Sequence, residues 1–156
     1  AAPTHILPAL PERADPQGEL LDFLPNTTEW SALRLRLNQP NPALDTKLCE
    51  QQFSGGAFLT NANPLGAALS DRGNAQRNAA LQRGLLQRGL PHWPGLGVPD
   101  DAQSWAAEPS FFITGLDQEA ALNMARYCEQ LAFVWHAVGQ PTQLCLTGLR
   151  PDSAAD

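Results

Sequence analysis

Alternating apolar and polar residues indicate the first strands of the chain. At residues 32–37 (ALRLRL), three leucines alternate with two arginines, which is typical of a half-buried strand. A Gly-Gly pair precedes residues 57–61 (AFLTN), an apolar run that predicts a central strand. Before both strands, residues 19–25 (ELLDFLP) predict a short apolar turn or helix that ends at its proline.

A helical pattern follows at residues 70–89. The Ser-Asp pair at its start is suited to cap the helix, and Gly89 is suited to end it. At about 100° per residue, Asn74 and Arg77 lie at the edge of the side that carries the inner leucines. Polar groups at such positions need partners.

Further segments complete a predicted sheet with a second helix. Residues 110–114 (SFFIT) and 131–138 (LAFVWHAV) are apolar enough for buried strands, and residues 141–146 predict the partner strand of a hairpin. A helix is predicted from residue 118 to about residue 130. Residues 90–98 (LPHWPGLGV) fit either an edge strand or an irregular loop.

From residue 57 onward, the order is strand, helix, strand, strand, helix, strand, with one strand added at each end. This order predicts an α+β fold of the ferredoxin-like, split βαβ type (β-α-β-β-α-β) with extra strands. We expect a mainly antiparallel sheet with two helices on one face. The prediction depends on residues 90–98, because a different α+β topology follows if they form no strand.

Composition divides the chain into three parts. Residues 1–18 contain four prolines and few large apolar side chains, which predicts an extended or mobile N-terminal leader. Residues 19–149 are predicted to form a single α+β domain, and residues 150–156 a polar C-terminal tail. Hydrophobic residues make up 43% and charged residues 17% of the 156 residues, as expected for a globular chain.

The same totals disfavour several classes of protein. No run reaches the roughly 18–20 apolar residues that a membrane-spanning helix needs, and the first residues do not resemble a signal peptide, so we expect a cytoplasmic protein. The net charge of −6 argues against nucleic-acid binding. Three widely spaced cysteines predict buried free thiols. No metal site is expected, because His92 and His136 have no neighbouring carboxylate or cysteine.

Candidate chemistry gathers in three segments. Residues 61–64 (NANP) lead toward a helix whose first N–H groups, together with Arg77, would form an anion pocket. Glu108 lies just before a strand, and it either pairs with Arg77 or acts as an acid or base. Gln130, at the end of the second helix, either caps that helix or faces the same pocket. The sequence identifies no cofactor.

These segments resemble a known family. AFLTNANP, GNAQRNAAL, WAAEPSFFITGL and CEQLAFVW, all within residues 30–147, are similar in type and order to motifs of the uncharacterised bacterial family catalogued as domain of unknown function 3293. The sequence departs from the family pattern at Asn61 and at Cys128-Glu129. The resemblance implies a small protein with no assigned activity. By position, it points to Asn63, Pro64, Asn74, Arg77, Glu108, Ser110 and Gln130. If these residues converge, they form either a binding site or a buried network that specifies the fold.

Three functions are compatible with these residues. The first is a binding module for a small anionic or nucleotide-like metabolite, in which Arg77→Ala abolishes binding and leaves folding largely intact. Its expected ligand-binding residues are Asn63, Asn74, Arg77, Glu108, Ser110 and Gln130. The second is an interaction protein or accessory subunit that contacts a protein partner through residues 1–18 and its edge strands. The third is a hydrolase-type enzyme that uses Glu108 as an acid or base.

Overall fold

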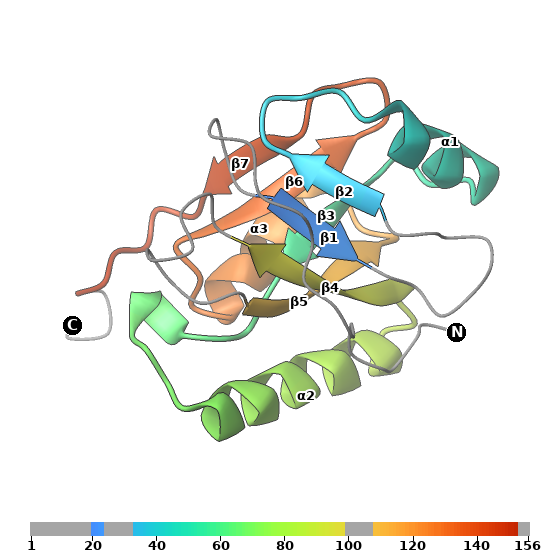
Figure 1. Cartoon of the computed structure of the whole chain (residues 1–156). Coiled ribbons are helices and arrows are strands. Elements are labelled where there is room, and N and C mark those ends of the chain that lie inside the picture. The colour runs from blue at the N-terminus through green and yellow to red at the C-terminus, as the bar shows by residue number, and fades with distance from the viewer. Residues whose placement is uncertain (1–19, 24–32, 99–107, 153–156) are drawn as a thin grey trace.

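The computed structural model describes residues 20–23, 33–98 and 108–152 (Figure 1). The predicted leader at residues 1–18 and the end of the predicted tail lie outside the described residues. The helices are α1 (Pro42–Glu50), α2 (Asp71–Gln87) and α3 (Gln118–Tyr127). The strands are β1 (Leu20–Phe23), β2 (Leu33–Arg36), β3 (Gly55–Leu59), β4 (His92–Val98), β5 (Glu108–Thr114), β6 (Ala132–Ala137) and β7 (Gln143–Leu146).

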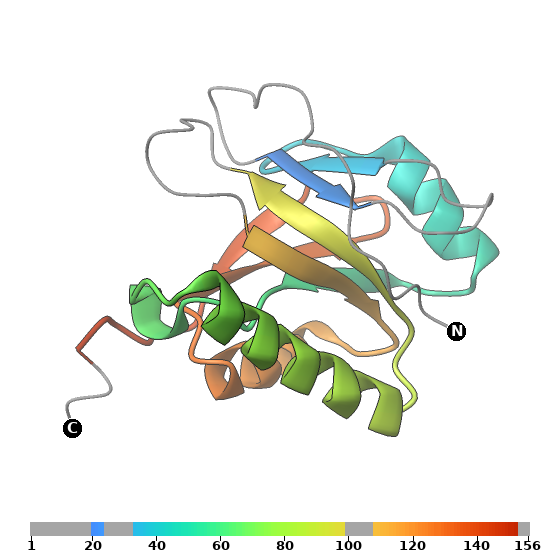
Figure 2. The same cartoon turned by 60° about the horizontal axis from the view of Figure 1, so that its bottom comes forward.

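The ferredoxin-like prediction is confirmed. Its β-α-β-β-α-β unit consists of β3, α2, β4, β5, α3 and β6, and residues 92–98 do form the strand on which the prediction depended. The sheet order is β2-β1-β4-β5-β3-β6-β7, and every pair is antiparallel. Helices α2 and α3 cover one face of the sheet (Figure 2). The extra strands β1 and β2 extend the edge at β4, and β7 extends the edge at β6.

Two local predictions were wrong or incomplete. The segment expected to form a turn or helix contains β1, because it pairs on one side with β2 and on the other with β4. Helix α1 was not predicted. It is only 9 residues long, begins with a proline, and is capped by Asn41, whose side chain accepts a hydrogen bond from the N–H of Leu44 at 3.1 Å. A helix this short has few periodic positions, so its pattern is weak.

The sheet curls until its two edges meet. The N–H of Asn38, just after β2, donates to the carbonyl of Thr142 at 2.7 Å, and the N–H of Thr142 donates to the carbonyl of Gln39 at 3.0 Å. Thr142 precedes β7, so these bonds join opposite edges of the sheet. The face away from α2 and α3 is therefore concave.

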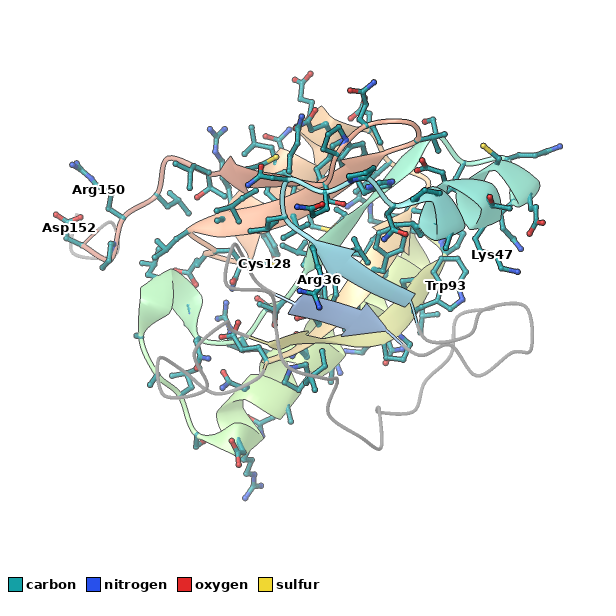
Figure 3. The ribbon with its side chains drawn as sticks, turned by 45° about the horizontal axis from the view of Figure 1, so that its top comes forward. Arg36, Lys47, Trp93, Cys128, Arg150 and Asp152 are labelled. Carbon is teal, nitrogen blue, oxygen red and sulfur yellow. The ribbon has the colours of Figure 1, made fainter. Side chains whose placement is uncertain are left out.

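Helix α1 fills one end of this concave face. Leu44 and Leu48 on α1 are fully buried, and Trp93 lies on the same side of the sheet (Figure 3). His136 ties the helix down, because its Nε2 lies 2.6 Å from Asp45 and its Nδ1 lies 2.9 Å from Thr142. The core on this face consists of Leu35, Leu44, Leu48, Phe58, Trp93, Phe112 and Val134.

The cysteines are free, as predicted, but they are not all buried. Cys128 is buried, Cys145 is partly buried and Cys49 is exposed. Burial raises the pKa of the Cys128 thiol to about 11. Since the thiolate is the nucleophilic form of cysteine, Cys128 is an inert packing residue near neutral pH.

Candidate functional site

An unusual backbone follows β3. Asn63 and Leu65 have positive φ angles of 48° and 53°, and Glu129 has a φ of 58°. A bulky residue such as leucine rarely adopts this left-handed conformation. Here Leu65 is buried, and its N–H donates to the carbonyl of Glu129 at 2.7 Å. Backbone strain of this kind persists only where surrounding contacts fix it, and it often marks functional loops.

Asn74, in the first turns of α2, orients Asn63. The N–H of Asn63 donates to Oδ1 of Asn74 at 2.9 Å, and Nδ2 of Asn74 donates back to Oδ1 of Asn63 at 2.9 Å. The N–H of Leu69 also donates to Oδ1 of Asn63, at 3.0 Å. The amide oxygen of Asn63 is thus held toward α2, so its Nδ2 points the other way, toward Glu108.

Glu108, the first residue of β5, receives that donor. Asn63 Nδ2 lies 2.6 Å from Glu108 Oε2, and the other carboxylate oxygen has no hydrogen-bond partner among the described residues. Desolvation raises the pKa of Glu108, and the bond from Asn63 only partly opposes this effect. The hydroxyl of Ser110 donates to the main-chain carbonyl of Glu108 at 3.1 Å, which steadies the start of the strand.

Asn78, which was not among the predicted site residues, links the end of β3 to the start of β5 next to Glu108. Its Oδ1 accepts from the N–H of Asn61 at 2.9 Å, and its Nδ2 donates to the carbonyl of Pro109 at 3.0 Å. Thr60, also missed, donates its hydroxyl to the same Pro109 carbonyl at 2.8 Å. The signal was available for Asn78, because it shares the inner stripe of α2 with leucines three and seven residues later.

Arg77 does not pair with Glu108, so that predicted pair is wrong. Its Nε and Nη2 donate to the carbonyl and Oδ1 of Asn61, and Nη2 also donates to the carbonyl of Cys128 at 2.9 Å. Its Nη1 lies 3.6 Å from Glu129 Oε1. Arg77 therefore clamps the loop after β3 to the end of α3, and these contacts use most of its donors.

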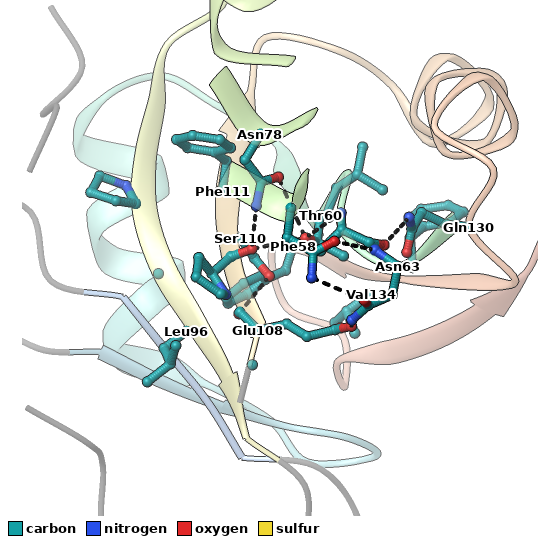
Figure 4. A pocket seen from close by; sticks show the side chains of 18 of the residues that line it. Phe58, Thr60, Asn63, Asn78, Leu96, Glu108, Ser110, Phe111, Gln130 and Val134 are labelled. Atoms are coloured by element: carbon teal, nitrogen blue, oxygen red, sulfur yellow. Dashed lines mark hydrogen bonds between the residues drawn. The ribbon is translucent and has the colours of Figure 1, made fainter. Parts of the chain in front are cut away.

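Gln130 joins the end of α3 to the loop after β3. Its Nε2 donates to the carbonyl of Cys128 at 3.1 Å, at the end of α3, and to the carbonyl of Ala62 at 2.9 Å. The side chain is buried, and it also lines the groove beside Asn63 and Glu108 (Figure 4).

The groove has a volume of about 1050 Å³. Five of the six predicted ligand-binding residues line it, and the exception is Arg77. Its described lining includes two acids, Asp71 and Glu108, but no arginine, lysine or histidine. Hydrogen-bond donors or positive charge would complement the two carboxylates of this described lining. The groove-lining residues from the predicted set are Asn63, Asn74, Glu108, Ser110 and Gln130.

Metal-binding clusters and membrane-spanning helices are both absent from the described residues. These residues contain no group of three or more His, Cys, Asp or Glu side chains that could hold a metal ion. None of the helices among residues 20–23, 33–98 and 108–152 has the length and apolar character required to cross a membrane.

Replacing Glu108 with glutamine is expected to stabilise the fold near neutral pH. Because burial raises the folded-state pKa of Glu108, the folded protein binds this proton more tightly than the unfolded chain does. The carboxylate thus costs stability above the folded-state pKa and costs nothing below the ordinary glutamate value of about 4.3. Denaturant unfolding across this pH range measures the difference, which should vanish in acid.

Glu119→Gln, on the exposed side of α3, is the matched control for this experiment. This control should show no pH-dependent gain in the free energy of unfolding. A Glu108→Gln protein that is less stable than wild type at neutral pH would show that the carboxylate has a structural role instead.

Comparison with known proteins finds one family model that matches the part of the chain containing most of the groove residues. Residues 59–133 match the family model described as "Protein of unknown function (DUF3293)". The match runs from the end of β3 into β6, and it includes every residue to which the sequence motifs pointed. None of the curated proteins or solved structures compared with the chain matches it. This match over residues 59–133 to a family of unknown function confirms the resemblance seen in the motifs.

Proposed function

We propose that this protein is a small-molecule binding module whose groove holds a hydrogen-bond donor of its ligand at Glu108. The observation that carries the proposal is the state of this carboxylate. It is partly buried, one oxygen is fixed by Asn63 at 2.6 Å, and the other oxygen has no partner within the described residues. An acceptor held in this way in a groove is suited to orient a ligand.

The charges of the groove modify the ligand expected from the sequence. The hypothesis of an anionic ligand loses its main support, because Arg77 is bound to Asn61, Cys128 and Glu129. The donor groups of a nucleobase-like ring, an amidine or an amine would instead complement Glu108. For a nucleotide, the base edge fits this chemistry, whereas the phosphate would meet no basic residue in the described lining.

An enzyme is the second candidate, and the raised pKa of Glu108 favours it. A carboxyl group whose pKa is shifted upward can act as a general acid or base near neutral pH. Such an enzyme would lose turnover in Glu108→Gln while still binding its substrate. Of the interaction surface expected at residues 1–18 and the edge strands, residues 1–18 lie outside the described residues, while the edge strands β2 and β7 are joined to each other near Asn38 and Thr142.

Ligand binding can be tested by native mass spectrometry and by ¹H–¹⁵N NMR with fragments. The fragments are adenosine, cytidine and benzamidine, which present donors on flat polar edges. We expect at least one of them to bind and to shift the side-chain amide signals of Asn63 and Asn74. Binding should weaken about tenfold or more in Glu108→Gln, because a charged acceptor is lost, and it should persist in the surface control Glu119→Gln.

Two results would contradict the proposal. One is that none of the fragments shifts a groove residue and that the purified protein carries no added mass. The other is binding with equal affinity in wild type and Glu108→Gln, which would place the ligand elsewhere.

A further inference from the structure

Small residues of β4 and β5 line the groove on the concave face next to Glu108. Gly97 of β4 pairs with Glu108, and Gly95 pairs with Ser110. Side chains alternate between the faces of a sheet, so these positions share a face with Phe112, whose side chain belongs to the core under α1. Toward α1 this face is filled by large apolar side chains, whereas β4 and β5 carry two glycines and a serine on it near Glu108.

Apolar side chains form the part of the groove wall that lies on the concave face of β3, β6 and β7. Phe58 of β3 and Val134 of β6 belong to the concave-face core and also line the groove. Leu144 of β7 pairs directly with Val134, so it lies on the same face. Leu144 is 49% exposed and lines the groove with them. An apolar side chain left this open at the wall of a groove is a candidate contact for an apolar ligand group.

Charge complementarity indicates which polar group of a ligand would lie near Glu108. Glu108 lies at the same end of the concave face, and the described lining contains no basic residue to neutralise it. A fatty acid or another anionic amphiphile would place like charges together. A protonated amine would instead form a charge-assisted hydrogen bond with the Glu108 oxygen that Asn63 does not contact.

We propose that the groove binds amphipathic amines, with the apolar body of the ligand against Phe58, Val134 and Leu144 and its ammonium group at Glu108. This inference rests on the proposed function and narrows its ligand class. It requires both halves of the groove, whereas binding of a polar fragment requires only the half around Glu108 and Asn63.

Matched short-chain probes test the inference by NMR titration or calorimetry near neutral pH. We expect octylamine to bind about tenfold or more tightly than octanol, and octanoate to bind weakest. Butylamine should bind at least about tenfold more weakly than octylamine, because it buries fewer methylene groups. Glu108→Gln should reduce octylamine binding to the level of octanol.

Leu144→Ser tests the apolar wall, and Leu86→Ser is its control. Both leucines are exposed, at 49% and 56%, so neither change should unfold the protein. Leu86 lies on α2 and does not line the groove. We expect Leu144→Ser to weaken octylamine binding several-fold and to leave butylamine nearly unchanged, while Leu86→Ser affects neither.

The outcomes separate this inference from the proposed function. If butylamine or the polar fragments bind in a Glu108-dependent way, but chain length and Leu144→Ser make no difference, the inference is overturned and the proposed function stands. If octanol or octanoate binds as tightly as octylamine, the inference is likewise overturned. If no probe or fragment shifts a groove residue, both proposals fail.

Discussion

Arg77→Ala is expected to lower the free energy of unfolding by about 3 kcal/mol. The guanidinium donates to the carbonyl and side chain of Asn61 and to the carbonyl of Cys128, and its partner Glu129 lies 3.6 Å away. Its removal leaves these acceptors without their donor at a partly buried site, and each buried orphan costs about 1–3 kcal/mol. This expectation reverses the sequence-based one, in which Arg77→Ala spared folding and abolished binding.

Denaturant unfolding of three variants measures the role of this clamp. Arg83→Ala, on the exposed side of the same helix, is the control and should change stability by less than about 0.5 kcal/mol. Arg77→Lys should fall between the two, because an ammonium group cannot reproduce the planar fork of the guanidinium. An Arg77→Ala protein as stable as the Arg83→Ala control would show that the clamp contributes little and that Arg77 is free to serve a ligand.

Asn78→Ala is expected to destabilise the protein by about 2 kcal/mol. Asn78 is buried, and it bridges the N–H of Asn61 to the carbonyl of Pro109. Alanine leaves the Asn61 N–H without this acceptor, at a cost of about 1–3 kcal/mol. The Pro109 carbonyl loses less, because it keeps the hydroxyl of Thr60. Thermal or denaturant unfolding measures the change.

The same variant should also disturb the site, because Pro109 follows Glu108 directly. We expect the side-chain amide signals of Asn63 to shift or broaden in Asn78→Ala. Asn123→Ala, at an exposed position of α3, should alter neither stability nor these signals. A stability loss without any change at Asn63 would show that Asn78 supports the fold independently of the groove.

Local patterns predicted much of the scaffold because they depend on neighbours along the chain. The cap at Ser70 accepts a hydrogen bond from Gly73, three residues later, and Asp117 does the same for Ala120. Gly89 has a φ of 67°, as its position after α2 predicted. The same neighbour rules do not describe residues 20–23, which form a strand through pairs with distant segments.

The sequence alone determined the ferredoxin-like order of elements and the residues around which the groove forms. Period and capping are local properties, and polar residues on an apolar side of a helix must find partners. Only the tertiary structure decided which partners they found. Glu108 meets Asn63 rather than Arg77 because β3 and β5 are neighbours in the sheet, so that the loop after β3 lies at the start of β5. The curl of the sheet, likewise set by contacts between distant segments, created the concave face beside this carboxylate.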